Sequence, residues 1–297
     1  MLEGKSNYIS SVQNERVKTI VKLMNKESER KAAKAFLVEG PRMCAEIPEG
    51  TLLSLYWTQA LEENLVKNQL DAGKAGDEDR VSTAVLQKMQ EAEEAGIGFY
   101  VSDTVMEKMS GTKNPQGILA LVSQPEWTWE DVMGRGEKVP LLVLLDRLQD
   151  PGNMGTIFRT AEAAGATGIL IGNGSASPLQ PKVVRSTMGA SFRLPYISFD
   201  REEDFLEAMD RCAKEGIAIY AMHLEGDTFY TRDFTEPSGF LIGNEGNGLT
   251  DSVAERASRK IRIPMQGKTE SLNAAVSATV VLFETERQRL IAAGENM

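Results

Sequence analysis

The chain has 297 residues, of which 41% are hydrophobic and 26% are charged, a composition that excludes a disordered protein and suits two domains. Its two cysteines lie far apart in the sequence and exclude a disulfide framework, and its single histidine, His223, excludes a multi-histidine metal site. No apolar stretch reaches the roughly 20 residues needed to cross a membrane. The net charge of −10 weighs against non-specific binding to nucleic acid, and we expect a soluble cytoplasmic protein without a metal.

The first segment of the chain departs from this acidic average. Residues 1–42 hold nine basic residues against five acidic ones. Residues 14–34 are predicted to form a helix, and "AFLVEG" at 35–40 a buried strand. A basic arm of this kind fits a specific nucleic-acid partner, although a solvated helix face explains it equally well.

Strands and helices alternate through the rest of the first half. The strings "LLSLYWT", "GFYVS" and "QGILALV" read as strands, "DTVMEKMS" reads as a helix, and the polar stretch 62–80 reads as a helix followed by a loop. Residues 1–123 are therefore predicted to form a small α/β domain. Apolar periodicity fades over 124–138, which we expect to be a linker.

The strands change character from residue 139 onward. They become continuous apolar runs, "VPLLVLL", "GILI", "IAIYAM", "GFLIG" and "KIRIP", which are typical of a parallel sheet covered on both faces. Residues 139–297 are therefore predicted to form a second α/β domain. Ligands of such sheets bind beyond the carboxyl ends of the strands, so the residues that follow each run are the candidates for function.

A first motif, "NMGTIFRTA", follows the run at 139–145. Asn153 is a good N-cap for a helix that would extend to about Ala164 and stop at Gly165. Arg159 lies opposite the apolar stripe of this helix, so it can leave the packed face. The alternative is a capped surface helix with an exposed arginine.

A second motif, "FLIGNEGNGL", places a glycine-rich turn after a strand. Gly243, Gly246 and Gly248 permit close backbone approach to a ligand, and Glu245 lies within the turn. The order of the glycines differs from the GxGxxG of dinucleotide sites, and no acidic residue ends the next strand, which disfavours a nicotinamide-dependent oxidoreductase. A tight structural turn remains the alternative.

A third motif, "IPMQGKTESLNAAVSA", joins a strand to a helix. Ser271 or Asn273 can cap this helix, whose small first residues let its backbone approach another element closely. Capping alone would explain both side chains. The "GKT" at 267–269 is no phosphate-binding loop, because Arg262 stands where that motif requires glycine.

Together and in this order, the three motifs resemble the signature motifs of the SpoU (TrmH-like) family in the SPOUT class of RNA methyltransferases. The resemblance covers about residues 139–292. The "FLVEG" and "GTKNPQGILALV" strings resemble, more loosely, the ribosomal-protein-like substrate-binding domain often attached to this family. The implied fold is a parallel-sheet α/β domain with a deep trefoil knot, preceded by a small ribosomal-protein-like α/β domain.

The resemblance also implies a cofactor and an assembly. In the family the knot loops hold S-adenosyl-L-methionine (AdoMet), largely through backbone groups, and the protein is a homodimer with the active site near the subunit interface. The positions that match the family's cofactor-binding residues are Leu241, Gly243, Ile263, Met265 and Leu272.

The implied reaction is methylation of a ribose 2′-hydroxyl, which also selects RNA over DNA. By resemblance Arg159 is essential, and the family assigns it the role of proton acceptor. A guanidinium offers no acceptor, so we expect it to hold a phosphate and stabilise an alkoxide. Asn153 and Asn273 would orient Arg159 or the ribose, Glu245 would fix the second-motif loop or Arg159, and Ser271 would support the site.

The RNA substrate is less constrained than the reaction. Ribosomal RNA, most simply 23S RNA, is favoured over transfer RNA because the N-terminal domain resembles one from ribosome-modifying members. The alternatives are the same chemistry on transfer RNA and an RNA-binding knotted protein that has lost catalysis.

Overall fold

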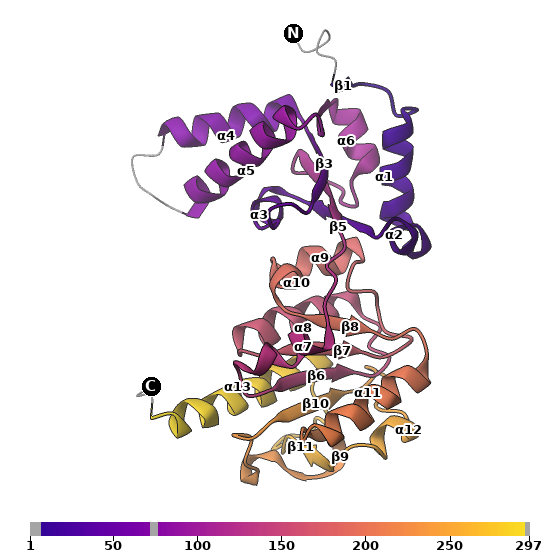
Figure 1. Cartoon of the computed structure of the whole chain (residues 1–297), viewed down its shortest axis with the longest axis vertical. Coiled ribbons are helices and arrows are strands. Elements are labelled where there is room, and N and C mark those ends of the chain that lie inside the picture. The colour runs from indigo at the N-terminus through magenta and orange to yellow at the C-terminus, as the bar shows by residue number, and fades with distance from the viewer. Residues whose placement is uncertain (1–6, 72–76, 295–297) are drawn as a thin grey trace. The chain divides into compact units, whose positions relative to one another are not determined.

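The computed structural model describes residues 7–71 and 77–294, and the chain divides into two compact units. One unit comprises Met1–Pro125 together with Leu179–Phe192, and the other comprises Glu126–Pro178 together with Arg193–Met297. Figure 1 colours the chain from end to end.

The first unit is built on a mixed sheet of five strands in the order β1-β4-β3-β5-β2. Strand β5 runs antiparallel to β2 and β3, while the β1–β4 and β3–β4 pairs are parallel. The elements are β1 (Tyr8–Ile9), α1 (Glu15–Asn25), α2 (Glu27–Ala33), β2 (Ala35–Glu39), α3 (Pro41–Ala45), β3 (Leu52–Trp57), α4 (Gln59–Asp71), α5 (Asp77–Glu94), β4 (Gly98–Val101), α6 (Asp103–Met109) and β5 (Ile118–Ser123), with α9 (Pro181–Thr187) and most of α10 (Ala190–Arg193) added from later in the chain.

The N-terminal segment forms two helices where one was predicted. Lys26 adopts an extended backbone (φ −125°, ψ 123°) and ends α1 while beginning α2. The buried Arg30 then donates a 2.7 Å hydrogen bond to the carbonyl of Leu23, a group that the end of α1 leaves unpaired. This arginine of the basic arm therefore has a structural task.

Helix α5 was not predicted, although the sequence carries a signal for it. The stretch expected to be a helix and a loop begins with α4, and α5 follows over Asp77–Glu94. Val85, Met89 and Ala92 are buried on it at intervals of four and three residues, which is the spacing of one helix face.

The second unit has a six-stranded sheet in the order β11-β9-β10-β6-β7-β8, and every pairing in it is parallel, as predicted. Strand β8 was missed because it is only three residues long. The elements are α7 (Trp129–Val132), the 3-10 helix η1 (Gly134–Gly136), β6 (Leu141–Leu145), α8 (Pro151–Ala163), β7 (Gly168–Ile171), β8 (Tyr196–Ser198), α11 (Glu202–Lys214), β9 (Ala218–Thr228), the 3-10 helix η2 (Phe229–Thr231), β10 (Ser238–Ile242), α12 (Asp251–Ala254), β11 (Arg259–Arg262) and α13 (Ala274–Ala292).

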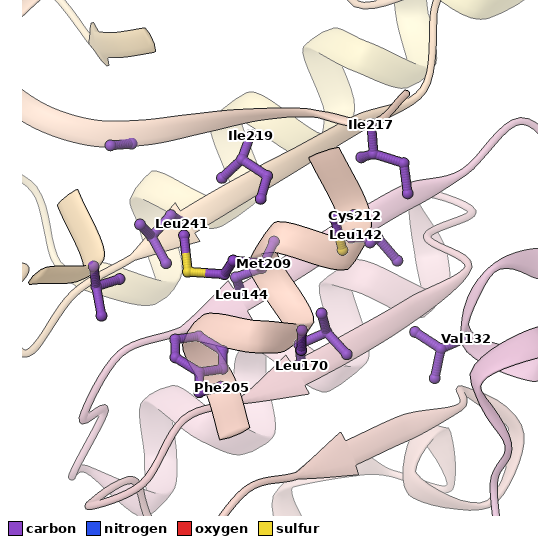
Figure 2. Close-up of a cluster of buried hydrophobic side chains, with 13 residues drawn as sticks. Val132, Leu142, Leu144, Leu170, Phe205, Met209, Cys212, Ile217, Ile219 and Leu241 are labelled. Carbon is purple, nitrogen blue, oxygen red and sulfur yellow. The ribbon is translucent and has the colours of Figure 1, made fainter. Parts of the chain in front are cut away.

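Both faces of this sheet are covered, which explains the continuous apolar runs. Phe205, Met209 and Cys212 of α11 pack on one face, against side chains that include Leu144 and Leu241 (Figure 2). Helices α8 and α13 pack against each other, and α13 also lies against β10. None of the described helices is long and apolar enough to span a bilayer.

The segment 124–138, expected to be a linker, contains regular structure. Thr128 and Asp131 form a capping box at the start of α7. Val132 of that short helix is fully buried in the core beneath α11. Residues 129–132 are thus held by the sheet of the second unit.

Candidate functional site

The loops that carry the first two motifs emerge from neighbouring strands. Leu145 at the end of β6 pairs with Ile242 at the end of β10, and the backbone N–H of Asp146 donates to the carbonyl of Ile242 over 2.9 Å. Because the strands are parallel, both loops leave the same edge of the sheet. Polar residues that are distant in sequence therefore meet there.

Helix α8, which carries Asn153 and Arg159, begins at a different cap from the one predicted. Asp150, rather than the predicted Asn153, is the N-cap: its carboxylate accepts the backbone N–H of Asn153 over 2.8 Å, and Pro151 occupies the first helical position. The helix ends as predicted, with Gly165 at a φ of 71°. Since Asp150 takes the capping role, the side-chain amide of Asn153 is available for longer-range contacts.

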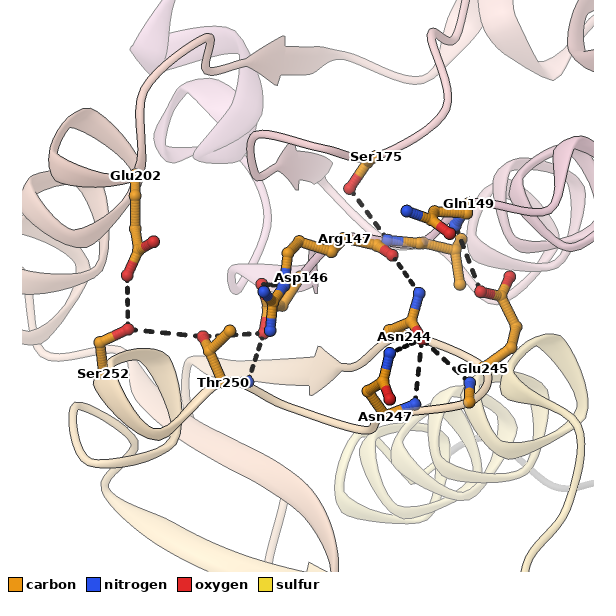
Figure 3. Close-up of polar contacts among 12 residues, drawn as sticks. Asp146, Arg147, Gln149, Ser175, Glu202, Asn244, Glu245, Asn247, Thr250 and Ser252 are labelled. Atoms are coloured by element: carbon orange, nitrogen blue, oxygen red, sulfur yellow. Dashed lines mark hydrogen bonds and ion pairs between the residues drawn. The ribbon is translucent and has the colours of Figure 1, made fainter.

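Glu245 joins the second-motif loop to the first-motif turn. Its carboxylate accepts the backbone N–H groups of Gln149 (3.2 Å) and Asp150 (3.0 Å) and the side-chain amide of Asn153 (3.0 Å), and Figure 3 shows the contact with Gln149. Partial burial raises the pKa of the Glu245 carboxyl, but the bond from Asn153 and the backbone donors outweigh it, so the pKa lies below its ordinary value. Glu245 is therefore held as a carboxylate.

Asn273 extends this connection to the third motif. It caps α13, accepting the backbone N–H groups of Ala275 (2.9 Å) and Val276 (3.3 Å). Its amide nitrogen also donates to Oδ1 of Asn153 over 2.9 Å. The line Asn273–Asn153–Glu245 thus bridges all three motifs, and we call it the amide–carboxylate line.

The second-motif loop closes tightly on itself. Asn244 and Gly248 exchange two backbone hydrogen bonds of 2.9 Å, and a Cβ on Gly243 would lie 2.4 Å from the carbonyl carbon of Gly248. Only glycine allows this approach at position 243. The loop is also tied to the end of β6, since the Asn244 amide donates to the carbonyl of Arg147 over 2.9 Å (Figure 3).

Arg159 and Ser271 stay outside the amide–carboxylate line. Both side chains are exposed, and neither makes a hydrogen bond or ion pair with any residue in the described parts of the chain. Of the alternatives expected for Asn153, Asn273 and Glu245, contact with Arg159 is not seen among the described residues, whereas Glu245 does tie the second-motif loop to the first-motif turn. Arg159 does leave the packed face of α8, as predicted.

The predicted cofactor residues divide into two groups. Ile263, Met265 and Leu272 are half-buried in the segment between β11 and α13, and Gly243 opens the second-motif loop. Leu241 differs, because its side chain is fully buried in the core and its backbone pairs with both β6 and β9. The side chain of Leu241 therefore has no surface to offer a ligand, whereas the other four residues are partly exposed.

Three polar residues of the site were not singled out from the sequence: Asp146, Asn244 and Thr250. Asp146 is 3% exposed, and its carboxylate accepts the backbone N–H (2.7 Å) and hydroxyl (3.1 Å) of Thr250. Their position in the sequence could have indicated them as site residues, since Asp146 and Asn244 lie one and two residues after the end of a buried strand. They fix the shape of the second-motif loop from both ends.

The basic arm offers less free charge than its composition indicated. Lys18 pairs with Glu15 (2.7 Å), Lys31 pairs with Glu27 (3.4 Å), and the guanidinium of Arg16 lies 4.4 Å from the centre of the Phe99 ring. Such surface pairs are weak and can be exchanged for a phosphate. Lys18, Lys31 and Arg16 of the arm thus already have contacts within the chain.

Comparison with family models matches both units. A model described as the SpoU rRNA Methylase family matches residues 140–283, and a model described as an MRM3-like substrate binding domain matches residues 14–120. The first match includes the complete amide–carboxylate line and Arg159.

Individual relatives extend the similarity to nearly the whole chain. The 23S rRNA (guanosine(2553)-2′-O)-methyltransferase RlmP of Bacillus subtilis is 30% identical over 277 residues, covering 93% of this chain and 97% of the relative. The 23S rRNA (uridine(2479)-2′-O)-methyltransferase of Streptomyces viridochromogenes is 36% identical over 192 residues, covering 63% of this chain and 66% of the relative. The crystal structure of the SpoU methyltransferase AviRb from Streptomyces viridochromogenes with AdoMet is similar with a TM-score of 0.75 and 26% identity, over 94% of this chain and 99% of that one.

Proposed function

The chain belongs to the SpoU rRNA methylase family, and on that premise we propose that it methylates a ribose 2′-hydroxyl of ribosomal RNA, most simply 23S RNA, with AdoMet as the methyl donor. The observation that carries the proposal is the amide–carboxylate line. It brings the three motifs to one edge of a parallel sheet, where α/β proteins bind their ligands.

The loops around this line fit a cofactor held through backbone groups. Gly243 allows the second-motif loop to close, and Ile263, Met265 and Leu272 are half-buried apolar residues in the segment between β11 and α13. We assign these four residues to AdoMet. The bound cofactor supplies a methyl group activated by a sulfonium.

The chain's own residues position the acceptor and stabilise charge. The guanidinium of Arg159, which no described residue contacts through a hydrogen bond or ion pair, offers donors for an RNA phosphate or for the alkoxide that develops when the 2′-hydroxyl loses its proton. It carries no lone pair with which to accept that proton, so we assign the proton to solvent water. Asn153, Asn273 and Glu245 hold the loops in place, and orientation of this kind can contribute roughly 7–11 kcal/mol. Ser271 lies two residues before Asn273 and is a candidate for contact with the ribose.

Ribosomal RNA is favoured over transfer RNA as the substrate. The relatives named above act, by their names, on 23S rRNA, and the model matching residues 14–120 is described as a substrate binding domain. We propose that residues 1–123 contact the RNA and residues 139–297 carry out the transfer. We also propose that the protein works in the cytoplasm.

We also propose a homodimer formed through α13 and α8. Val276, Phe283 and Ile291 of α13 are 47%, 43% and 53% exposed, and their spacing of seven and eight residues places them on one face of the helix. An apolar stripe of this kind is typical of an interface. A second copy would cover it and could bring groups toward Arg159, which makes no hydrogen bond or ion pair with the residues described in its own chain.

The trefoil knot would involve the return of the chain from the sheet edge. Strand β11 lies at the edge beyond β9, whereas α13 packs on α8 and on the more central β10. Residues 263–273 therefore return from the edge strand to the centre of the sheet, and we propose that they cross past the second-motif loop on the way. We propose that this crossing is where the chain threads, an arrangement that is nearly absent from other folds.

Two measurements test the proposed function. Calorimetry should show AdoMet, or its demethylated product, binding in the micromolar range, while NAD should not bind. Mapping of 2′-O-methyl sites in total RNA from cells with and without the gene should show one lost site in ribosomal RNA. Loss of a transfer-RNA site would overturn the substrate, and AdoMet binding without any lost site would indicate a protein that has kept the fold and lost catalysis.

A further inference from the structure

Arg147 has a backbone conformation that arginine rarely adopts. Its φ is 50°, in the left-handed region that favours glycine. Among the described non-glycine residues, Lys34, Arg135 and Met188 share a positive φ, but each lies in a 3-10 turn or caps a helix. Arg147 instead follows β6 by two residues, at the edge where the three motifs meet. Strained residues concentrate at functional sites.

Several contacts hold Arg147 in this conformation. Its carbonyl accepts the amide of Asn244 over 2.9 Å, and its Nε lies 3.6 Å from the carboxylate of Asp146, which Thr250 holds in turn (Figure 3). A Cβ on Gly174 would lie 3.3 Å from the Cγ of Arg147, so the side chain runs closely past that glycine. The position of the arginine is thus determined on several sides.

The end of the side chain is left open. The side chain is 42% exposed, while its Nε is buried and has no hydrogen-bond partner. The two terminal nitrogens make no hydrogen bond with any residue in the described parts of the chain. The guanidinium is therefore held in place on a partly exposed side chain, and its two terminal nitrogens keep N–H groups that no described residue occupies. A planar fork of N–H donors of this kind matches the oxygens of a phosphate.

We propose that Arg147 binds a backbone phosphate of the substrate RNA beside the target ribose. This inference rests on the proposed function and adds a second RNA-binding arginine to Arg159. The placement supports it, because the residues directly after Arg147 belong to the site: the backbone N–H of Leu148 donates to Ser175, in the turn that follows β7 (3.1 Å), and that of Gln149 donates to Glu245. A purely structural residue here would be glycine, which adopts this φ without strain.

The test compares Arg147→Gly with Arg147→Lys and with Arg211→Gln, which removes one positive charge from an exposed ion pair with Glu215 on α11. The probe is 23S rRNA transcribed in vitro, and its dissociation constant is measured at several salt concentrations. Arg147→Gly should weaken RNA binding by about tenfold and lower the slope of log K against log salt by about 0.9, because one phosphate contact is lost. Arg147→Lys should keep most of the slope, and Arg211→Gln should match wild type.

AdoMet affinity and thermal stability separate this role from a structural one. Arg147→Gly should leave the AdoMet dissociation constant within about twofold of wild type, with an unchanged or higher melting temperature because the strain is relieved. The inference would be overturned if Arg147→Gly bound RNA with the affinity and salt slope of the wild type. It would also be overturned if Arg147→Gly lost AdoMet binding together with RNA binding. If the wild-type protein bound no AdoMet and methylated no RNA, the proposed function itself would fail.

Discussion

Gly243→Ala tests whether the closed second-motif loop is what binds the cofactor. The added Cβ would lie 2.4 Å from the carbonyl carbon of Gly248 and 2.6 Å from both its oxygen and the nitrogen of Leu249. All three are backbone atoms, so relief to an ordinary contact of about 3.4 Å requires the loop itself to move by about 1 Å. Forced repacking of this kind costs about 1–3 kcal/mol.

The same cost should appear in cofactor binding. At about 1.4 kcal/mol for each factor of ten, calorimetry should find the AdoMet dissociation constant raised roughly 5- to 150-fold in Gly243→Ala. Gly246→Ala is the matched control in the same loop, because its Cβ would meet only the side-chain oxygen of Asn244, at 3.6 Å. Wild-type AdoMet affinity in Gly243→Ala, or equal losses in both variants, would refute the reasoning.

Three further predictions concern catalysis, pH and assembly. Arg159→Ala should slow methyl transfer at least about 100-fold in single-turnover assays, because removal of one hydrogen-bond donor to a developing negative charge costs roughly 10²–10³ in rate. AdoMet affinity should stay unchanged. Unchanged turnover would remove Arg159 from the mechanism. The pKa of Glu245 is lower in the folded protein than in the unfolded chain, where it is about 4.3. The Glu245 carboxylate therefore stabilises the fold above that unfolded-state pKa, and this stabilisation is lost as the pH falls through the folded-state pKa. The difference in melting temperature between wild type and Glu245→Gln should therefore shrink below about pH 4, and a constant difference would contradict the assignment. Phe283→Glu should convert the dimer to a monomer in sedimentation equilibrium. Val66→Glu, at a similarly exposed position on α4, should leave the dimer intact. A monomeric wild-type protein would contradict the proposed interface.

The parallel sheet and the exposure of Arg159 could be predicted because each depends on a local pattern. Continuous apolar runs indicate strands covered on both faces, and a helix with one apolar stripe indicates which residue turns outward. The cap of α8 shows the limit of such patterns. Asp150 and Asn153 are both good N-caps, and only the proline at the first helical position favours the observed choice.

The contacts of Glu245 could not be predicted, because they join residues more than 90 positions apart. No periodicity or turn signal encodes such a pairing, which arises from the neighbouring ends of β6 and β10. The expectation that Glu245 fixes either the second-motif loop or Arg159 left two partners open for the same reason: motif order places residues near one edge without saying which side chains touch. The positive φ of Arg147 could not be predicted either, because an arginine in the sequence does not indicate a left-handed backbone.

Residues 179–192 have a consequence for any attempt to divide the protein. They lie in sequence between β7 and β8 of the second unit, yet α9 packs on β2, Arg185 pairs with Glu39 over 3.5 Å, and the rings of Phe36 and Phe192 lie 5.9 Å apart. A fragment that ends near residue 125 would lose this cover and expose apolar side chains of β2 to water. Each half of the gene thus encodes part of the first unit, and recombination between two relatives at residue 125 would separate two surfaces that must match.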